Sequence, residues 1–174
     1  FLNPSSKDHI AFTQKHPCGV VVAISAFNHP INLIIHQVIP AVAVGAPVIV
    51  KPAETTPLTC FKLLDLLHQA GLKKAWAQAV LCENNIAEKL ATAPKVSYLS
   101  FIGSAKVGWY LRSKLSPGTR CALEHGGSAP VIIDTTADLT KALPALIKGG
   151  FYHAGQVCVS VQRVFVQKKI FDDF

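Results

Sequence analysis

Methionine is absent from the 174 residues, only 16% of which are charged and 8% aromatic. The glycines form neither the G-x-G-x-x-G nor the Walker A pattern, so two common nucleotide-binding fingerprints are missing. The five cysteines have no C-x-x-C spacing, which disfavours a zinc site, and we expect no bound metal. Their odd number disfavours a disulfide framework and predicts a reducing, cytoplasmic location.

Hydrophobic runs are too interrupted to predict a membrane span. The longest apolar stretch, residues 31–50, contains polar residues, prolines and a glycine, so it predicts a buried helix followed by a strand. The net charge is +7, but Lys and Arg are dispersed, which disfavours nucleic-acid binding. A basic surface also suits a phosphate-bearing ligand. We therefore expect neither a membrane nor a nucleic acid as a partner.

The length of the chain allows one domain or one and a fraction, and half of its residues are hydrophobic, which is enough for a core. The chain does not begin with methionine, and residues 168–174 have the pattern of the start of another helix. We therefore expect it to be a piece of a longer protein.

Apolar, β-branched runs alternate with segments of helical periodicity. The expected strands are residues 19–25, 48–50, 79–81, 97–102, 120–123, 130–134 and 163–167. The expected helices are 31–44, with Pro40 as a kink or boundary, 57–71, with Thr56 as a cap, 84–91, 104–115 and 137–149. This alternation predicts an α/β fold with an open, parallel, Rossmann-like sheet and helices on both faces. A boundary near 123–128 would separate a first domain, 1–123, from the beginning of a second α/β domain, 124–174.

Three strand-to-helix loops contain residues that suit ligand contacts. In Lys51-Pro52-Ala53-Glu54, the lysine could donate to ribose hydroxyls and the glutamate could accept from them, although a solvated loop is the ordinary alternative. Gly103-Ser104 precedes a helix, which suits either a bound phosphate or an ordinary N-cap. Asn28 could donate to a developing oxyanion or serve only the turn.

A carboxylate and a cysteine form the pattern most relevant to chemistry. Glu124 begins the segment Glu124-His125-Gly126-Gly127, and Cys158 ends the segment Gly155-Gln156-Val157-Cys158. Together they offer a base and a nucleophile for thioester chemistry at a carbonyl. Alone, Glu124 would be a surface carboxylate, and Cys18, Cys60, Cys82 and Cys121 are expected to be inert. A Cys–His acyl-transfer enzyme would instead need His29, His36, His125 or His153 beside Cys158.

Five segments in this order resemble the aldehyde dehydrogenase superfamily. They are Phe27-Asn28-His29-Pro30, Val50-Lys51-Pro52-Ala53-Glu54, Phe101-Ile102-Gly103-Ser104, the Glu124 segment and the Cys158 segment. The resemblance extends from about Pro17 to Phe165. It implies that residues 1–123 are part of the family's NAD(P)-binding domain and that 124–174 are the truncated start of its catalytic domain.

The resemblance implies oxidation of an aldehyde to a carboxylic acid with NAD as cofactor and NADP as the alternative. Cys158 would be the nucleophile, Asn28 and the backbone N–H of Cys158 would hold the oxyanion, and Glu124 would activate water. The implied cofactor-binding residues are Ser25, Ala26, Phe27, Lys51, Pro52, Ala53, Glu54, Gly103, Ser104, Val107, His125 and Gly126. Glu54 favours NAD, because a carboxylate would repel a 2′-phosphate. The implied partners are a small-molecule aldehyde and, in the longer protein, further copies of the same chain.

Some residues depart from the family pattern. Residues 81–85 stand where the family often has a glycine-rich turn, His125 replaces a usual leucine, and Ser128 replaces a common lysine. The family's later Glu-Phe-Gly-Pro-type segment is missing, so we expect little or no dehydrogenase activity from this chain alone. The alternatives are a CoA-acylating aldehyde dehydrogenase, which often lacks the base that Glu124 supplies, and a non-catalytic nucleotide-binding or interaction fragment.

Overall fold

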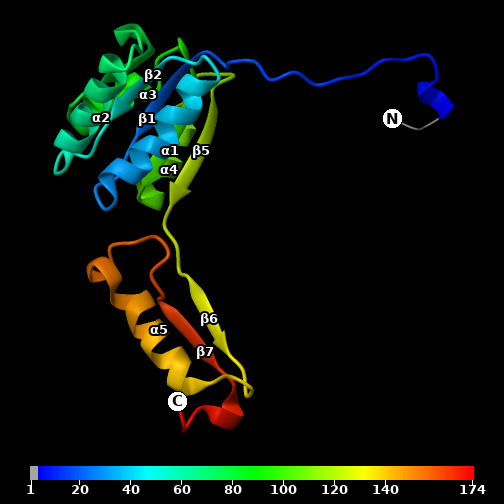
Figure 1. Ribbon diagram of the computed structural model, residues 1–174, viewed down its shortest axis with the longest axis vertical. Coiled ribbons are helices and arrows are strands. Elements are labelled where there is room, and N and C mark those ends of the chain that lie inside the picture. Colours follow the sequence, from blue (N-terminus) through cyan, green and yellow to red (C-terminus); the bar gives the residue numbers. More distant parts are fainter. Residues whose placement is uncertain (1–3) are drawn as a thin grey trace.

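The structure, a computed structural model, describes residues 4–174 and contains two parallel β-sheets (Figure 1). The strands are β1 Val20–Ile24, β2 Val48–Lys51, β3 Ala77–Ala79, β4 Val96–Gly103, β5 Arg120–His125, β6 Pro130–Ile133 and β7 Arg163–Val166. The α-helices are α1 Pro30–Ala43, α2 Pro57–Gln69, α3 Asn84–Ala91, α4 Ala105–Lys114 and α5 Leu139–Phe151. Short 3-10 helices are η1 Pro4–Ser6, η2 Lys74–Trp76, η3 Tyr152–Gly155 and η4 Lys168–Ile170. The predicted α/β class and parallel sheet are confirmed.

The first sheet has five parallel strands in the order β3-β2-β1-β4-β5. The chain adds β2 and then β3 on one side of β1, and it then returns to add β4 on the other side of β1. This reversal makes the β1–β4 pair a topological switch point, where open α/β sheets bind ligands beyond the carboxyl ends of their strands. The register there pairs Ile24 of β1 with Phe101 of β4.

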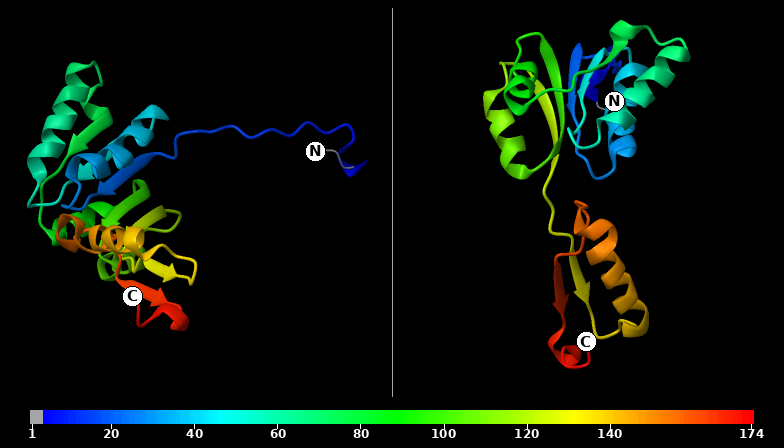
Figure 2. Two further views of the ribbon diagram at one scale, coloured as in Figure 1. Left: turned by 60° about the horizontal axis from the view of Figure 1, so that its bottom comes forward. Right: turned by 90° about the vertical axis from the view of Figure 1, so that its left-hand side faces the viewer.

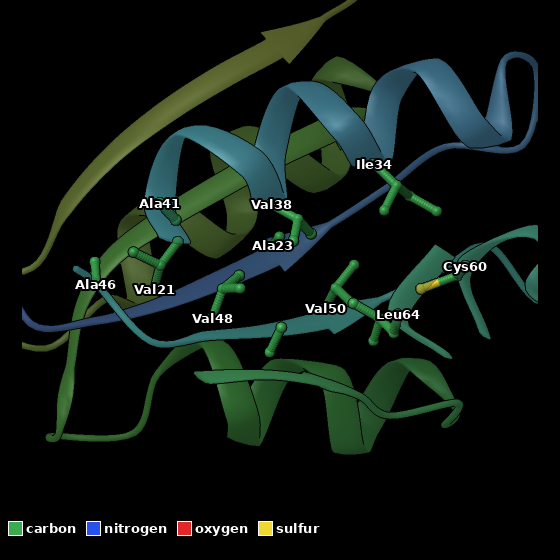
Figure 3. Packing of buried hydrophobic residues seen from close by; sticks show 11 residues of the cluster. Val21, Ala23, Ile34, Val38, Ala41, Ala46, Val48, Val50, Cys60 and Leu64 are labelled. Atoms are coloured by element: carbon green, nitrogen blue, oxygen red, sulfur yellow. The ribbon is translucent and has the colours of Figure 1, made fainter. Parts of the chain in front are cut away.

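Side chains of β1 alternate between two hydrophobic clusters, one on each face of the first sheet. Val21 and Ala23 pack with α1 and α2, whereas Val22 and Ile24 pack with α3 and α4. In Figure 3 the labelled side chains of α1 lie over those of β1 and β2. Full burial of a Val or Ile side chain stabilises the fold by roughly 1.5–3 kcal/mol. Burial on both faces explains why the strands are near-continuous apolar runs.

The second sheet pairs β6 with β7 in parallel, and α5 connects the two strands (Figures 1 and 2). Residues 126–129 join it to β5 of the first sheet. Ile133 is buried, whereas Ile132 is 80% exposed and Phe165 is 55% exposed. The second sheet therefore presents apolar side chains to solvent.

Three local predictions differ from the structure. The strand expected at 79–81 is found at Ala77–Ala79, because β3 pairs with β2 from the Val48–Ala77 position onward. Pro40 is not a boundary, since α1 continues to Ala43. Thr56 occupies the N-cap position and Pro57 begins α2, both as predicted, but the Thr56 side chain makes no capping hydrogen bond.

Residues 9–18 form an exposed segment without regular structure that leads away from the first sheet (Figures 1 and 2). Among the helices of residues 4–174, none combines the length and the apolar character needed to cross a membrane.

Candidate active site

The predicted cofactor residues lie at the carboxyl ends of neighbouring parallel strands. Ser25, Ala26 and Phe27 follow β1, Lys51 ends β2, and Gly103 ends β4. Because β2, β1 and β4 are adjacent and parallel, their carboxyl ends share one edge of the sheet. The structure therefore brings these predicted residues together at the switch point.

Lys51 and Glu54 form an ion pair at this edge. The Nζ of Lys51 donates to the Oε1 of Glu54 at 3.2 Å. The lysine side chain is 8% exposed and the glutamate side chain 56% exposed, so the ammonium is enclosed while the carboxylate reaches solvent. The N–H of Ser25 donates to the Lys51 carbonyl at 3.0 Å, and the Ser25 hydroxyl is buried without a partner in the part of the chain described. A ligand hydroxyl can satisfy such a group.

The N-terminus of α4 lies beyond the end of β4. The Oγ of Ser104 accepts a hydrogen bond from the N–H of Val107 at 3.4 Å, which confirms the predicted cap. The N–H groups of Ala105 and Lys106 have no acceptor among the described residues. Free N–H groups and the positive end of the helix dipole both suit an anion such as a phosphate.

Asn28 joins this edge to the loop that carries Cys158. The Nδ2 of Asn28 donates to the backbone carbonyl of Gln156 at 2.8 Å, and its Oδ1 accepts from the N–H of His29 at 3.2 Å. A side-chain amide nitrogen has two N–H donors, so one is left for a ligand. The N–H of Cys158 also has no acceptor within residues 4–174. The two donors predicted for the oxyanion thus lie in loops that are bonded to each other.

The turn after Glu124 touches both α4 and the Cys158 loop. A Cβ added to Gly126 would lie 3.7 Å from the Cβ of Ala105, the first residue of α4. Gly127 has a φ of +148°, and a Cβ added there would lie 2.2 Å from the carbonyl oxygen of Cys158. Only glycine fits so close a backbone approach. Glu124 itself is exposed, so water can reach its carboxylate.

His125, the last residue of β5, packs against α4. Its ring meets Trp109 edge-on with 5.0 Å between ring centroids, and a Cβ added to Gly108 would lie 2.6 Å from its Cδ2. Its Nδ1 is buried without a partner in the described chain. His125 therefore ties the Glu124 turn to the helix whose N-terminus faces the predicted cofactor site.

Gln37 of α1 bridges the end of β1 and the middle of β4. Its Nε2 lies 3.2 Å from the Ile24 carbonyl and 3.0 Å from both the carbonyl and the hydroxyl of Ser100. The side chain is only 6% exposed. Because one nitrogen donates to both strands, Gln37 holds them together beneath the switch point.

The loop before Cys158 has a strained backbone. His153 and Ala154 have φ values of 52° and 54°, and Gly155 follows with 72°. Residues with a Cβ rarely adopt this left-handed conformation, and such strain clusters at functional sites. The hydroxyl of Ser160 donates to the Gly155 carbonyl at 3.2 Å and closes the loop behind Cys158.

The five thiols are free and differ in exposure, with Cys158 and Cys18 exposed and Cys60 buried. Burial raises the pKa of the Cys60 thiol from its ordinary value of 9.0 to about 11, so it stays protonated and inert. Cys158 makes no hydrogen bond to a histidine within residues 4–174, so the Cys–His alternative gains no support. In the same residues, no group of three or more His, Cys, Asp or Glu could hold a metal ion.

Several contacts in the site are not predictable from local sequence. Gln156 and Gly127 lie within the recognised motifs, but nothing near them indicates that they meet Asn28 and the Cys158 backbone. For the contact between Gly127 and the Cys158 backbone, the only sequence signal is the pair of glycines in the segment that begins with Glu124. His29 and His153, interpreted from sequence as structural, stack with 5.1 Å between ring centroids beside the Asn28–Gln156 bond.

The family model for the aldehyde dehydrogenase family matches residues 2–174, which is longer than the resemblance seen in the motifs. The chain is 42% identical over 172 residues to the 3-sulfolactaldehyde dehydrogenase of Priestia aryabhattai, covering 98% of this chain and 36% of that protein. It is 39% identical over 175 residues to the lactaldehyde dehydrogenase of Methanocaldococcus jannaschii, covering 97% of this chain and 37% of that protein. The chain therefore belongs to the aldehyde dehydrogenase family. It spans a little over a third of the length of these relatives.

Solved structures of similar proteins show the same fold. The NADP-dependent glyceraldehyde-3-phosphate dehydrogenase of Bacillus halodurans, complexed with NADP, has a TM-score of 0.86 and 33% identity, covering 91% of this chain and 33% of that one. The betaine aldehyde dehydrogenase of Staphylococcus aureus, in complex with NAD+, has a TM-score of 0.86 and 33% identity, covering 90% of this chain and 32% of that one.

Proposed function

We propose that the protein containing this chain oxidises an aldehyde to a carboxylic acid, with NAD or NADP as hydride acceptor. The observation that carries the proposal is the contact of three functional segments. The Asn28 amide bonds to Gln156 in the Cys158 loop, and Gly127, in the turn after Glu124, packs against the Cys158 carbonyl. An oxyanion donor, a nucleophile and a base thus come from segments that touch. Membership of the aldehyde dehydrogenase family supports this assignment.

Cys158 would begin the reaction. Its thiolate would attack the carbonyl carbon, so that an S–C bond forms and the carbonyl π electrons move to oxygen. The free N–H of Asn28 and the backbone N–H of Cys158 would stabilise that oxyanion. Loss of one such donor typically lowers the rate roughly 10²- to 10³-fold. A bound nicotinamide would supply the hydride acceptor for the oxidation.

Glu124 would complete the reaction by releasing the acyl group. Its carboxylate would accept a proton from water as the water attacks the thioester carbonyl, and the carboxylic acid and the Cys158 thiolate would be the products. The exposure of Glu124 allows water to approach. A carboxylate at this position favours hydrolysis over transfer of the acyl group to coenzyme A.

The residues at the switch point fit a dinucleotide. The enclosed Lys51 ammonium and the unpaired Ser25 hydroxyl would bind ribose hydroxyls, and the free N–H groups at the start of α4 would face a phosphate. Phe27, 48% exposed, and Val107, 44% exposed, offer apolar contacts at the same edge. Two similar solved proteins are complexes with NADP and with NAD+. Glu54 favours NAD in this chain, because its carboxylate would repel a 2′-phosphate.

Calorimetry of NAD and NADP binding to the chain tests the cofactor site. We expect Lys51→Ala and Glu54→Ala each to weaken NAD binding about 10- to 100-fold, the effect of losing a hydrogen bond to a charged group. Matched controls are Lys62→Ala and Asp65→Ala, which remove a similarly spaced pair on α2 with 3.9 Å between charged atoms. No binding by a chain with native circular dichroism would contradict the assignment.

Other properties of the longer protein remain predictions. We expect a cytoplasmic homo-oligomer, and little or no turnover by the 174-residue chain alone, since it spans only about a third of its relatives. NAD-dependent oxidation of an aldehyde by the purified chain would disprove the second expectation.

A further inference from the structure

A hollow of about 460 Å³ is lined by residues at the end of α5 and by both chain neighbours of Cys158. It is lined by Lys148, Gly149, Tyr152, Val157, Val159 and Ser160. Two of these residues, Val157 and Val159, are the chain neighbours of Cys158. The hollow is therefore next to the thiol-bearing residue, on the side formed by the end of α5.

Tyr152 connects this hollow to a cluster of three rings. Its ring stacks with that of His29 at 6.4 Å between centroids and lies 6.0 Å from that of His153. His29 follows Asn28, the predicted oxyanion donor. Tyr152 thus belongs both to the lining of the hollow and to a ring cluster that includes the residue after Asn28.

The hollow and the ring cluster contain hydrogen-bond donors without acceptors in the described chain. In the described chain, the Lys148 ammonium, the Tyr152 hydroxyl and the imidazole of His29 make no hydrogen bond or ion pair. Ser160 lines the hollow too, but its hydroxyl is already bonded to a carbonyl of its own loop. Asp138, the acidic residue nearest α5 in sequence, precedes the other end of that helix and pairs with Lys141 at 3.2 Å. No carboxylate lines the hollow.

We propose that the substrate is an aldehyde with an anionic terminus, which Lys148, Tyr152 and His29 bind while the aldehyde carbon meets Cys158. This inference rests on the proposed function and adds the class of substrate. An ammonium together with O–H and N–H donors suits the oxygens of a carboxylate, a sulfonate or a phosphonate, which only accept hydrogen bonds. The valines beside Cys158 would contact the short carbon chain between the two ends.

Alkylation of Cys158 tests this proposal without NAD or turnover. Iodoacetate and iodoacetamide are nearly isosteric, but only the first carries a negative charge. Peptide mass spectrometry gives the rate ratio of the two reagents at Cys158 and, as an internal reference, at the exposed Cys18. We expect the ratio to favour iodoacetate at Cys158 about fivefold over the reference, the effect of one unit charge at ~4 Å in water.

The variants test whether a preference for iodoacetate at Cys158 comes from the residues of the hollow or from the basic residues of the chain in general. Lys148→Met is expected to return the Cys158 ratio to that of Cys18, and Tyr152→Phe to lower it partly. Lys89→Met is the matched control, because Lys89 is a lysine in the last turn of another helix, α3. A Cys158 ratio no higher than the reference, or one that Lys148→Met leaves unchanged, overturns the proposal.

A second pair of reagents identifies the kind of anion. The 2-sulfonatoethyl and the neutral methyl methanethiosulfonates replace the iodoacetyl pair, and a greater preference for the sulfonate identifies it as the favoured terminus over a carboxylate. Because these reactions need no cofactor, charge selectivity together with absent NAD binding would leave the anion site standing and remove the dehydrogenase assignment. NAD binding without charge selectivity would leave the dehydrogenase assignment standing and overturn the anion site.

Discussion

The side-chain amide of Asn28 and the backbone carbonyl of Gln156 form a 2.8 Å hydrogen bond, although the residues are 128 positions apart. The bond links the loop after β1 in the first sheet with the loop between α5 and β7 in the second. Cys158 lies two residues beyond Gln156, so the bond holds the thiol-bearing loop beside the amide. Asn28 therefore positions this loop and still has a second N–H that no residue of the described chain accepts from.

Replacing Asn28 with alanine should impair acylation of Cys158 more than its alkylation. The variant loses both the bond to Gln156 and the oxyanion donor, so transfer of an acetyl group from p-nitrophenyl acetate to Cys158 should slow roughly 10²- to 10³-fold. Iodoacetamide, whose reaction forms no oxyanion, should react within a few-fold of the original rate. The control is Asn32→Ala, an exposed asparagine of α1. Equal losses for both reagents would mean that Asn28 only positions the loop.

Replacing Gly127 with alanine should displace the Cys158 loop. The new Cβ would lie 2.2 Å from the Cys158 carbonyl oxygen, so one of the two segments must move. Acylation of Cys158 should fall at least about tenfold, and the free energy of unfolding should fall by more than about 1 kcal/mol. Gly118→Ala is a matched control, because Gly118 also has a positive φ, +86°, but no atom within 4 Å of the added Cβ. If both variants behave alike, backbone strain rather than the contact explains the effect.

Replacing Gln37 with leucine should destabilise the first sheet at the switch point. The substitution removes the amide nitrogen that donates to the carbonyls of Ile24 and Ser100, and leucine has no donor to replace it. Each carbonyl or hydroxyl left unpaired costs about 1–3 kcal/mol. Urea unfolding should show the loss, whereas Gln69→Leu, an exposed glutamine that bonds only within α2, should change stability by less than about 0.5 kcal/mol.

Stability should fall at high pH because of Cys60. The pKa of its thiol is raised from 9.0 to about 11 in the folded chain, so the unfolded chain loses this proton at a lower pH. The contribution of the protonated Cys60 thiol to the free energy of unfolding is fully present below pH 9. As the pH rises to about 11 the free energy of unfolding falls by up to about 3 kcal/mol. The difference in free energy of unfolding between the original chain and Cys60→Ala, measured by urea at several pH values, should shrink across this range. A difference that stays constant with pH would show that burial does not raise the pKa of the Cys60 thiol.

The sequence predicted the order and type of the elements because their signals are local. Strands such as Val20–Ile24 are buried on both faces, so they are continuous apolar runs that can be recognised without the fold. The exceptions depend on tertiary contacts. The short strand Ala77–Ala79 takes its position from pairing with β2, and α1 continues past Pro40 although proline usually limits a helix.

The site was predicted less completely. Residues at strand ends could be placed on one edge, because parallel strands necessarily share it. The bond from Asn28 to Gln156 and the contact of Gly127 with Cys158 depend on how the second sheet docks on the first, which no local pattern encodes. The left-handed backbone at His153 and Ala154 is equally invisible, since neither residue type favours it strongly.

The distance along the chain between Asn28 and Gln156 sets an order of events during synthesis. Domains generally fold from the N-terminal end as the ribosome extends the chain. All five strands of the first sheet, which end at His125, are made before the Cys158 loop. Cys158 is therefore the last of the predicted catalytic groups to reach its place, and a nascent chain that stops earlier has the predicted dinucleotide-binding edge without this thiol.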